Sequence, residues 1–332
     1  MNSYMRRFLF LFMFISGWTF VLAAQPVKWK FFNKENSGLP SNEIRTVLQD
    51  KHGNYWIATW DDGLVKYDGK KWTVFNTKNS KLPHNSIYCM RFDQKGNLWI
   101  GTFGGGVAEF NCRNKWKIYN TANSELPNNW IYSIAIDNKS NVWIGTYTEG
   151  LAVFDHKKWT VYNKTNSILP NNKVTAIFIY KNDDKIIATA DHMIFIKNGV
   201  WKTEKEMNIN TDEDAVYWIS PYLNDEVLLC YKFGSIVIYD GKNFNFFNDK
   251  NSDLPFRGFY SVTADKKNTI WAGSFILGVV HRENDRWILF NKSNSELKDN
   301  MIFSIYVDNK NNKWFSTYKG GISIYNEDGV KF

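Results

Sequence analysis

The sequence predicts an all-β fold, a seven-bladed β-propeller of four-stranded antiparallel blades. Two observations lead to this prediction. The pattern Trp-x-x-[Phe/Tyr]-Asn, or its leading aromatic residue alone, recurs at intervals of 42 to 44 residues. This period is typical of propeller blades. The first residues of the seven copies are Trp29, Trp72, Trp116, Trp159, Trp201, Phe244 and Trp287. Each unit also contains four short β-type runs separated by turns, and no window has helical periodicity.

The third unit shows the order of these runs most clearly. We expect strands A, B, C and D at residues Ile131–Asp137, Val142–Thr146, Leu151–Asp155 and Trp159–Tyr162. Gly, Asn and Ser residues fill the turns between them, and Pro127 excludes a central strand from the connection before strand A. One such sheet cannot bury both of its faces, so the seven units should pack radially around an axis.

Two columns of the aligned units describe how the blades pack. Small residues recur in strand A at Thr46, Cys89, Ser133, Ala176, Ser261 and Ser304, with Trp218 as the exception in unit five, and a second small column lies in strand B at Ala58, Gly101, Gly145, Ala188, Cys230, Gly273 and Ser316. Strand B also carries Trp56, Trp99, Trp143, Trp271 and Trp314, replaced by Ile186 and Leu228 in units four and five. Large rings that recur at one structural position indicate packing between blades rather than a cofactor site.

Residues that could bind a metal form no convincing set, and we expect no metal or cofactor. The histidines occupy different units and different positions, at His52, His84, His156, His192 and His281. An aspartate closes strand A in five units, at Asp50, Asp93, Asp137, Asp265 and Asp308, and we expect it to cap the A–B turn. Calcium binding is the alternative, but one carboxylate per turn supplies few oxygen ligands.

The first residues indicate export. Arg6 and Arg7 precede an apolar run that ends in small residues at Ala23 and Ala24, which predicts a signal peptide over residues 1–24 and a single propeller domain over residues 25–332. The alternative is an uncleaved membrane anchor, because the apolar run is at the lower limit for spanning a bilayer. The expected location is therefore the periplasm or the outside of the cell, with no membrane span after cleavage.

Charge and cysteine content narrow the function classes further. The net charge of +8 is spread along the turns instead of gathered in a stripe, which argues against nucleic-acid binding. Cys89 and Cys230 fall in the small-residue columns, so we interpret them as packed core thiols, with a disulfide as the alternative. Cys112 follows strand C, where we expect an exposed thiol.

The last unit supplies only strands A to C, so its strand D must come from another part of the chain. We expect residues 27–32 to complete the seventh blade and close the ring. Residues 329–332 are the alternative.

The repeat resembles that of the two component regulator propeller family. Unit two carries the resemblance best, with Leu82-Pro83-His-Asn85, Asp93-Gln-Lys-Gly96-Asn97-Leu-Trp99-Ile-Gly101-Thr102 and Gly105. Units one, three and seven match well, units four and six keep parts of the pattern, and unit five has neither the Leu-Pro nor the Trp. In that family the propellers are periplasmic sensor regions of hybrid two-component systems. The resemblance implies a sensor or accessory role, here as a stand-alone seven-repeat propeller that would act through a membrane sensor kinase encoded separately.

The candidate ligand site lies in the loops at one mouth of the propeller, where the D–A and B–C connections meet. The first B–C position is aromatic in five of seven units and reads Trp60, Phe103, Tyr147, Ala190, Lys232, Phe275 and Tyr318. In the D–A connections, Trp130, Lys173, Arg257 and the acidic Asp212 depart from the repeat pattern. Exposed aromatic rings suit stacking on sugars or anchoring a peptide or protein. The alternative is that these rings only seal the loop layer.

These observations favour a non-enzymatic exported propeller that binds a glycan, peptide or protein, as a sensor or accessory module. An enzyme of the streptogramin lyase type is one alternative, and it needs His84 or His192 to meet carboxylates at the channel. A structural subunit of a surface complex is the other alternative.

Overall fold

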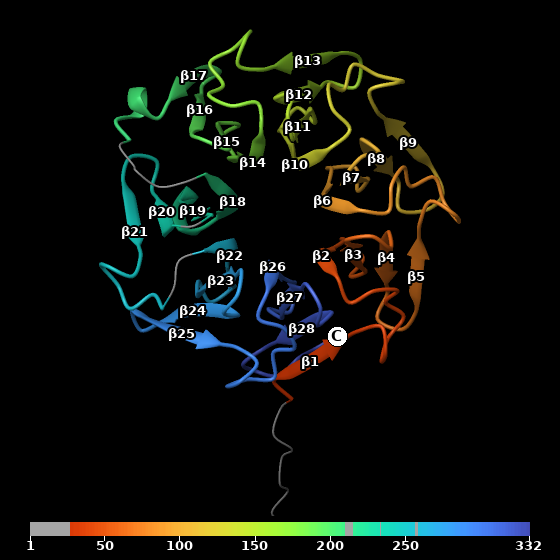
Figure 1. The fold of residues 1–332 in the computed structure, drawn as a ribbon, viewed down its shortest axis with the longest axis vertical. Helices are drawn as coiled ribbons and strands as arrows, with labels where there is room; N and C mark the ends of the chain where they lie inside the picture. Colours follow the sequence, from red (N-terminus) through yellow and green to blue (C-terminus); the bar gives the residue numbers. More distant parts are fainter. Residues whose placement is uncertain (1–26, 210–214, 233, 256–257) are drawn as a thin grey trace, which may run out of the picture.

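The computed structural model describes residues 27–209, 215–232, 234–255 and 258–332, which form seven four-stranded antiparallel sheets around one axis (Figure 1). Blades one to four consist of β2 (Ile44–Gln49), β3 (Tyr55–Thr59), β4 (Leu64–Tyr67) and β5 (Trp72–Phe75); β6 (Ile87–Phe92), β7 (Leu98–Thr102), β8 (Val107–Phe110) and β9 (Trp116–Tyr119); β10 (Ile131–Ile136), β11 (Val142–Thr146), β12 (Leu151–Phe154) and β13 (Trp159–Tyr162); and β14 (Val174–Ile179), β15 (Lys185–Thr189), β16 (Met193–Lys197) and β17 (Val200–Thr203). The predicted fold class is confirmed.

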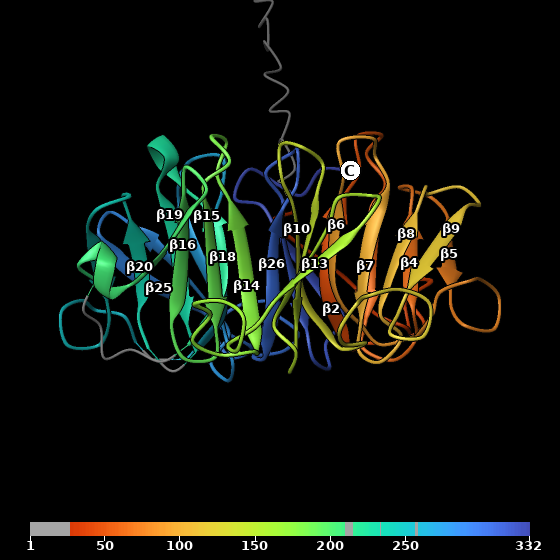
Figure 2. The same cartoon turned by 90° about the horizontal axis from the view of Figure 1, so that it is seen from above.

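The remaining blades repeat the same order. Blades five to seven consist of β18 (Val216–Pro221), β19 (Val227–Tyr231), β20 (Ile236–Tyr239) and β21 (Phe244–Phe247); β22 (Phe259–Ala264), β23 (Ile270–Ser274), β24 (Val279–Glu283) and β25 (Arg286–Phe290); and β26 (Ile302–Val307), β27 (Lys313–Thr317), β28 (Ile322–Tyr325) and β1 (Trp29–Phe32). The first strand of each blade lies nearest the axis, and the side view shows these strands running through the depth of the disc (Figure 2). The repeat did not predict two short 3₁₀ helices: η1 (Lys205–Met207) follows the last strand of blade four, and η2 (Leu223–Asp225) lies between the first two strands of blade five.

The N-terminal strand closes the ring, as predicted. Strand β1 pairs antiparallel with β28, with Trp29 opposite Tyr325 and Phe32 opposite Ile322. The Phe332 ring of the alternative segment 329–332 instead packs between blades seven and one, 5.7 Å from the Phe32 ring and 6.5 Å from the Tyr55 ring. Of the two terminal segments in competition, only the N-terminal one therefore contributes a strand.

The core lies between the blades, which confirms the role predicted for the strand-B tryptophans. Trp56 of blade one is fully buried against Phe110 of blade two, with ring centroids 5.8 Å apart. Small residues keep the inner strands close: a Cβ on Gly145 would lie 2.3 Å from Ser133 Oγ and 2.7 Å from Val174 of the next blade. Burial of large rings at each blade interface supplies most of the stabilisation expected for such a fold.

The aspartates that end strand A cap the A–B turns, as expected, and they have a second role that was not predicted. Asp137 accepts a hydrogen bond from the backbone N–H of Asn141 at 2.7 Å and another from Trp143 Nε1 at 2.9 Å. The same aspartate-to-tryptophan bond recurs in the other four units that carry both residues, at 2.9–3.3 Å, in the pairs Asp50–Trp56, Asp93–Trp99, Asp265–Trp271 and Asp308–Trp314. Each aspartate thus joins its turn to the blade interface.

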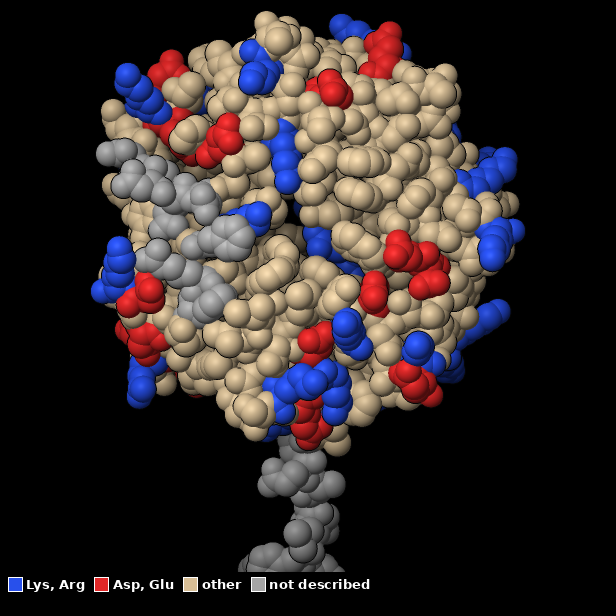
Figure 3. Space-filling model, viewed as in Figure 1, with Lys and Arg blue, Asp and Glu red and all other residues tan. Residues whose placement is uncertain are grey.

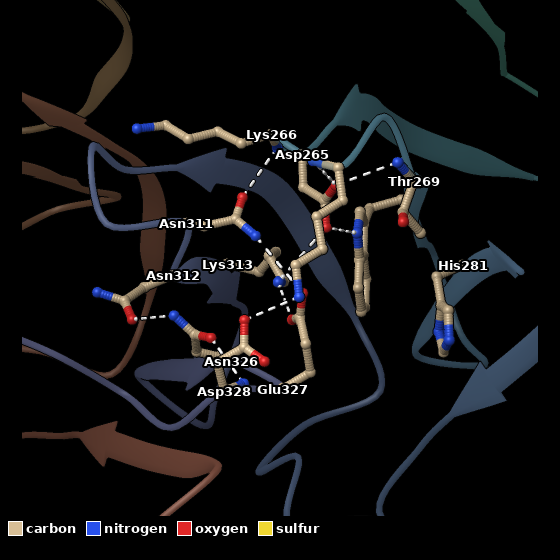
Figure 4. Close-up of polar contacts among 12 residues, drawn as sticks. Asp265, Lys266, Thr269, His281, Asn311, Asn312, Lys313, Asn326, Glu327 and Asp328 are labelled. Carbon is tan, nitrogen blue, oxygen red and sulfur yellow. Dashed lines mark hydrogen bonds and ion pairs between the residues drawn. The ribbon is translucent and has the colours of Figure 1, made fainter.

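A buried polar cluster ties blade six to blade seven (Figure 4). Lys313 is completely buried and forms ion pairs with Glu327 and with Asp265, whose Oδ2 lies 3.5 Å from Lys313 Nζ. Lys267 Nζ contacts Glu327 Oε1 at 2.9 Å and Asp328 Oδ2 at 2.8 Å. Burial on its own would raise the pKa of Glu327, but the hydrogen bonds from the two lysines outweigh it and hold that pKa at about 2.

The three cysteines are free thiols, so the disulfide alternative is excluded. Cys230 is buried, as predicted, whereas Cys89 is half-buried and borders the channel. The prediction of an exposed thiol at Cys112 is wrong, because this residue packs against the hydrophobic cluster between blades one and two. Burial raises the pKa of the Cys112 thiol to about 12, so it remains protonated at neutral pH.

Candidate functional site

The two loop columns singled out in the sequence meet in every blade. The backbone N–H of the first B–C residue donates to the carbonyl of the residue at the end of the D–A connection, for example Tyr147 to Trp130 at 3.0 Å and Phe103 to Ser86 at 2.9 Å. The other pairs, at 2.9–3.2 Å, are Trp60 with Glu43, Ala190 with Lys173, Lys232 with Ala215, Phe275 with Gly258 and Tyr318 with Met301. These paired residues form a layer at one mouth of the channel, which we call the rim.

A second layer, below the rim, was missed in the sequence. The register of strand A shifts between its first and third residues in every blade, for example between Ile131 and Ser133, so the second residue does not join the ladder. The seven second residues line the central cavity, and we call them the inner ring: Arg45, Tyr88, Tyr132, Thr175, Tyr217, Tyr260 and Phe303. The cavity has a volume of about 580 Å³, within the range of small-molecule sites.

Aromatic contacts join the rim to the inner ring around much of the mouth. Phe103 stacks on Trp130 with ring centroids 4.8 Å apart, and Tyr147 lies 5.4 Å from Tyr132 in a stacked arrangement. The chain of contacts continues through Tyr88–Tyr132 at 4.3 Å, Trp60–Phe303 at 6.2 Å, Phe303–Tyr318 at 5.9 Å, Tyr260–Phe303 at 5.8 Å and Tyr260–Phe275 at 5.0 Å. Trp130 and Phe275 remain 41% and 38% exposed, so ring surface is available at the mouth.

Basic side chains lie among these rings (Figure 3). The Arg45 guanidinium lies 3.9 Å from the centroid of Tyr88 and 4.9 Å from that of Phe303. Lys173 Nζ lies 5.0 Å from the centroids of both Tyr132 and Tyr147. Lys232, a predicted site residue, places its Nζ 5.4 Å from the Tyr217 centroid. Cation–π contacts of this kind position each charge at the mouth.

The predicted rim residues border the cavity without lining it. Trp60, Phe103, Trp130, Tyr147, Lys173, Lys232, Phe275 and Tyr318 all belong to the rim, whereas the cavity wall consists of inner-ring and deeper strand-A residues. Arg257 and Asp212 lie outside the described residues. One signal in the sequence could have revealed the inner ring. When the units are aligned, the second residue of strand A is aromatic in five of seven units.

Burial raises the pKa of three inner-ring phenols, Tyr88, Tyr132 and Tyr260. Their hydroxyl groups therefore stay protonated at neutral pH, and they can donate hydrogen bonds to a ligand. Among the described residues, the cavity wall contains no histidine, aspartate or glutamate.

The histidines considered for catalysis lie elsewhere. His192 Nδ1 is 3.0 Å from Glu204 Oε2, but neither residue belongs to the cavity wall. His84 Nδ1 accepts a hydrogen bond from the backbone N–H of Ser86 at 3.1 Å. In the described part of the chain, no group of three or more His, Cys, Asp or Glu side chains is arranged to hold a metal ion, and no helix is long and apolar enough to cross a membrane.

Comparison with known proteins identifies the repeat in part of the chain. The model for the two component regulator propeller matches residues 38–61, 81–104 and 125–148, each of which spans strands A and B of one of the first three blades. No curated protein matches the sequence.

Solved structures with similar folds have diverse roles. The extracellular domain of BT3049 from B. thetaiotaomicron, described as a hybrid two component system, aligns with a TM-score of 0.76 at 20% identity, covering 91% of this chain and 42% of that one. Virginiamycin B lyase from Staphylococcus aureus aligns with a TM-score of 0.72 at 15% identity, covering 90% and 99%. PorZ, a surface component of the type-IX secretion system of Porphyromonas gingivalis, aligns with a TM-score of 0.66 at 17% identity, covering 86% and 46%.

The chain spans only 40–42% of the length of the B. thetaiotaomicron structures that it matches. Similarity at these identities establishes the fold, because propellers with one architecture carry unrelated activities. The matched segments show the two component regulator propeller repeat in the first three blades, and the seven blades show the fold.

Proposed function

We propose that this protein is an exported, non-enzymatic propeller that binds a ligand at the aromatic mouth of its central channel. The observation that carries the proposal is the two-layered aromatic lining, rim over inner ring, around a cavity of about 580 Å³. A concave site lined mainly by apolar and aromatic groups, with a few polar groups that converge on it, has the usual character of a small-molecule site.

The chemistry of the lining favours binding over catalysis. Neutral phenol groups and cations can orient a ligand, whereas proton transfer requires an acid and a base within hydrogen-bond reach of the same substrate. The described cavity wall offers no carboxylate or imidazole for that role. A glycan fragment suits the lining, since sugar ring faces can stack on exposed aromatic surfaces such as those of Trp130 and Phe275.

A sensor or accessory role follows from the family. The propellers of hybrid two component systems that this chain resembles are extracellular domains, which supports export and the signal peptide proposed over residues 1–24. A membrane sensor kinase is the partner that fits this role. Ligand binding at the mouth would then change the surface that the rim loops present to the partner.

An oligosaccharide and peptide array tests the proposal directly. Saturable binding of an array member should be lost when Trp60, Tyr147 and Tyr318 are replaced together by Ala, with Trp130→Ala as a single and less disruptive variant. Ile288→Ala, on the exposed face of outer strand β25, is the control, and melting temperatures establish that each variant is folded. Retention of full affinity by both mouth variants, or the absence of any saturable ligand, contradicts the proposal.

A further inference from the structure

Three cations at the channel have no acidic partner. In the part of the chain that the structure describes, no carboxylate lies within ion-pair distance of Arg45, Lys173 or Arg91. Arg45 rests on aromatic rings, the nearest of which is Tyr88 at 3.9 Å. Lys173 has the Tyr217 hydroxyl at 3.5 Å as its closest polar contact.

Arg91 extends this positive charge into the channel. It is the fifth residue of β6, whereas Arg45 is the second residue of β2 on the neighbouring blade, so it lies roughly 10 Å deeper along the axis. Its side chain is exposed to the channel, and Nε makes one long contact of 3.5 Å, to the carbonyl of Ile134. Desolvation by the surrounding protein lowers the pKa of Arg91, although its side chain remains exposed to the channel.

Buried cations elsewhere in the same protein are paired. Lys313 has Asp265 and Glu327, and Lys185 has Asp183, whose Oδ2 lies 3.0 Å from Lys185 Nζ. A buried charge without a counter-ion is unfavourable, so proteins normally pair such charges. At the channel, Arg45 and Lys173 are half-buried and Arg91 is exposed to the cavity, and among the described residues none of the three has a carboxylate partner. Cations that stay accessible and unpaired in this way are the arrangement expected where the ligand brings the negative charge.

Two described acidic residues at or beside the rim, Glu43 and Asp61, are not part of the cavity wall. Asp61, the first acidic residue after the rim residue Trp60, accepts a hydrogen bond from Ser86 Oγ at 2.6 Å and is not part of the cavity wall. The wall itself, over the described residues, contains Arg45 and Arg91 and no carboxylate.

We infer that the channel selects a short acidic oligosaccharide, whose sugar rings stack on the rim and inner-ring aromatics while its carboxylate or sulfate groups contact Arg45, Lys173 and Arg91. This inference rests on the proposed function and adds the charge of the ligand. The spacing of the cations along the axis favours an elongated ligand with acidic groups on successive sugar units.

Calorimetric titration with matched probes tests the inference. Trigalacturonate and a sulfated chondroitin tetrasaccharide represent the two kinds of acidic group, galactotriose is the neutral control, and tetraglutamate is an acidic ligand without rings. At least one acidic sugar should bind about tenfold more tightly than galactotriose, and its affinity should fall as NaCl rises from about 50 mM to about 500 mM. Failure of both acidic sugars to bind, or equal affinity for galactotriose or tetraglutamate, overturns the inference.

Single-charge variants locate the selectivity. Lys173→Gln, Arg45→Gln and Arg91→Gln should each weaken the acidic sugar about tenfold. Lys117→Gln is the control, because Lys117 lies exposed on outer strand β9, where it pairs with Glu109, and its replacement removes the same charge far from the channel. This variant should bind the acidic sugar with unchanged affinity. If all three channel variants keep full affinity for the acidic sugar, the inference is wrong.

The two proposals fail in different ways. In one outcome, galactotriose binds as tightly as the acidic sugars, and the triple Ala variant of Trp60, Tyr147 and Tyr318 no longer binds it. This outcome would support the mouth as a ligand site and would refute its selectivity for acidic ligands. Binding of trigalacturonate that survives in the aromatic variant but is lost in the Lys173 and Arg45 variants would refute the aromatic basis of the proposed function.

Discussion

The hydroxyl group of Tyr55 in the first blade donates a 2.8 Å hydrogen bond to the carboxylate of Asp308 in the last blade, across 253 positions of the chain. Asp308 also accepts hydrogen bonds from Trp314 Nε1 at 2.9 Å and from the backbone N–H of Asn312 at 2.9 Å. Both partners of the Tyr55–Asp308 bond are buried. The ring is therefore closed by a buried polar contact in addition to the β1–β28 strand pair.

Loss of this contact should destabilise the protein measurably. Tyr55→Phe removes one donor from a buried carboxylate, and we expect the free energy of unfolding to fall by about 1–2 kcal/mol. Tyr67→Phe is the matched control, because the Tyr67 hydroxyl bonds only to the carbonyl of Gly69 within its own blade. Urea unfolding measures both, and equal effects of the two substitutions would show that ring closure gains nothing from the Tyr55 hydroxyl.

Removal of the Asp308 carboxylate should cost more. Asp308→Ala leaves the buried donors of Tyr55, Asn312 and Trp314 without their acceptor, and we expect the free energy of unfolding to fall by about 3 kcal/mol or more. Asp240→Ala, at an exposed C–D turn where Asp240 accepts hydrogen bonds from the backbone N–H groups of Lys242 and Asn243, should lower the free energy of unfolding far less. A melting temperature for Asp308→Ala close to that of Asp240→Ala would contradict this role.

The Lys313 cluster predicts acid sensitivity. The pKa of Glu327 is lowered from its ordinary value of 4.5 to about 2, so the stability that its ionised form contributes is complete above pH 4.5 and is lost as the pH falls toward 2. Glu327→Gln should remove this part of the acid dependence and lower stability at neutral pH by at most about 2 kcal/mol, after allowance for solvent screening. Melting temperatures followed from pH 7 to pH 2 test this, and unchanged acid dependence in the variant would disprove it.

His281 predicts a second pH dependence at a higher pH. Burial lowers the pKa of His281, which stacks on Trp271 at 4.4 Å, and this effect outweighs the opposing attraction of Glu283. Because the folded state resists protonation, stability should be full above about pH 6.5 and should fall as the pH drops below that value. His281→Leu should flatten the melting temperature between about pH 7 and pH 5, whereas His52→Gln, at an exposed turn, should leave the wild-type slope.

The repeat made the fold predictable, because each blade uses the same residues for the same contacts. The predicted strands of unit three differ from β10 to β13 by one residue, at the ends of strands A and C. The aspartate–tryptophan bond was also encoded, since units four and five lose both residues together and carry Tyr180 and Tyr222 where the others have Asp. Its geometry was not predictable, because spacing alone does not show that the ring nitrogen reaches the carboxylate.

The candidate site was predicted only in part. The rim could be inferred because propeller connections gather at one mouth, and the paired loop residues meet as expected. The inner ring was missed, because strict alternation along strand A gives no sign of the shift between residues such as Ile131 and Ser133, although its column of second residues is aromatic in five of seven units. Arg91 was overlooked for a related reason: only the closed ring reveals that this position lacks an acidic neighbour.

A crystal structure of the protein with the tightest acidic oligosaccharide from the titrations tests the central claim most directly. We expect electron density in the central cavity, with a sugar ring against Tyr132 or Trp130 and an acidic group within hydrogen-bond distance of Lys173 or Arg45. An empty cavity with the oligosaccharide bound on the outer strands, or at the opposite mouth, would contradict it.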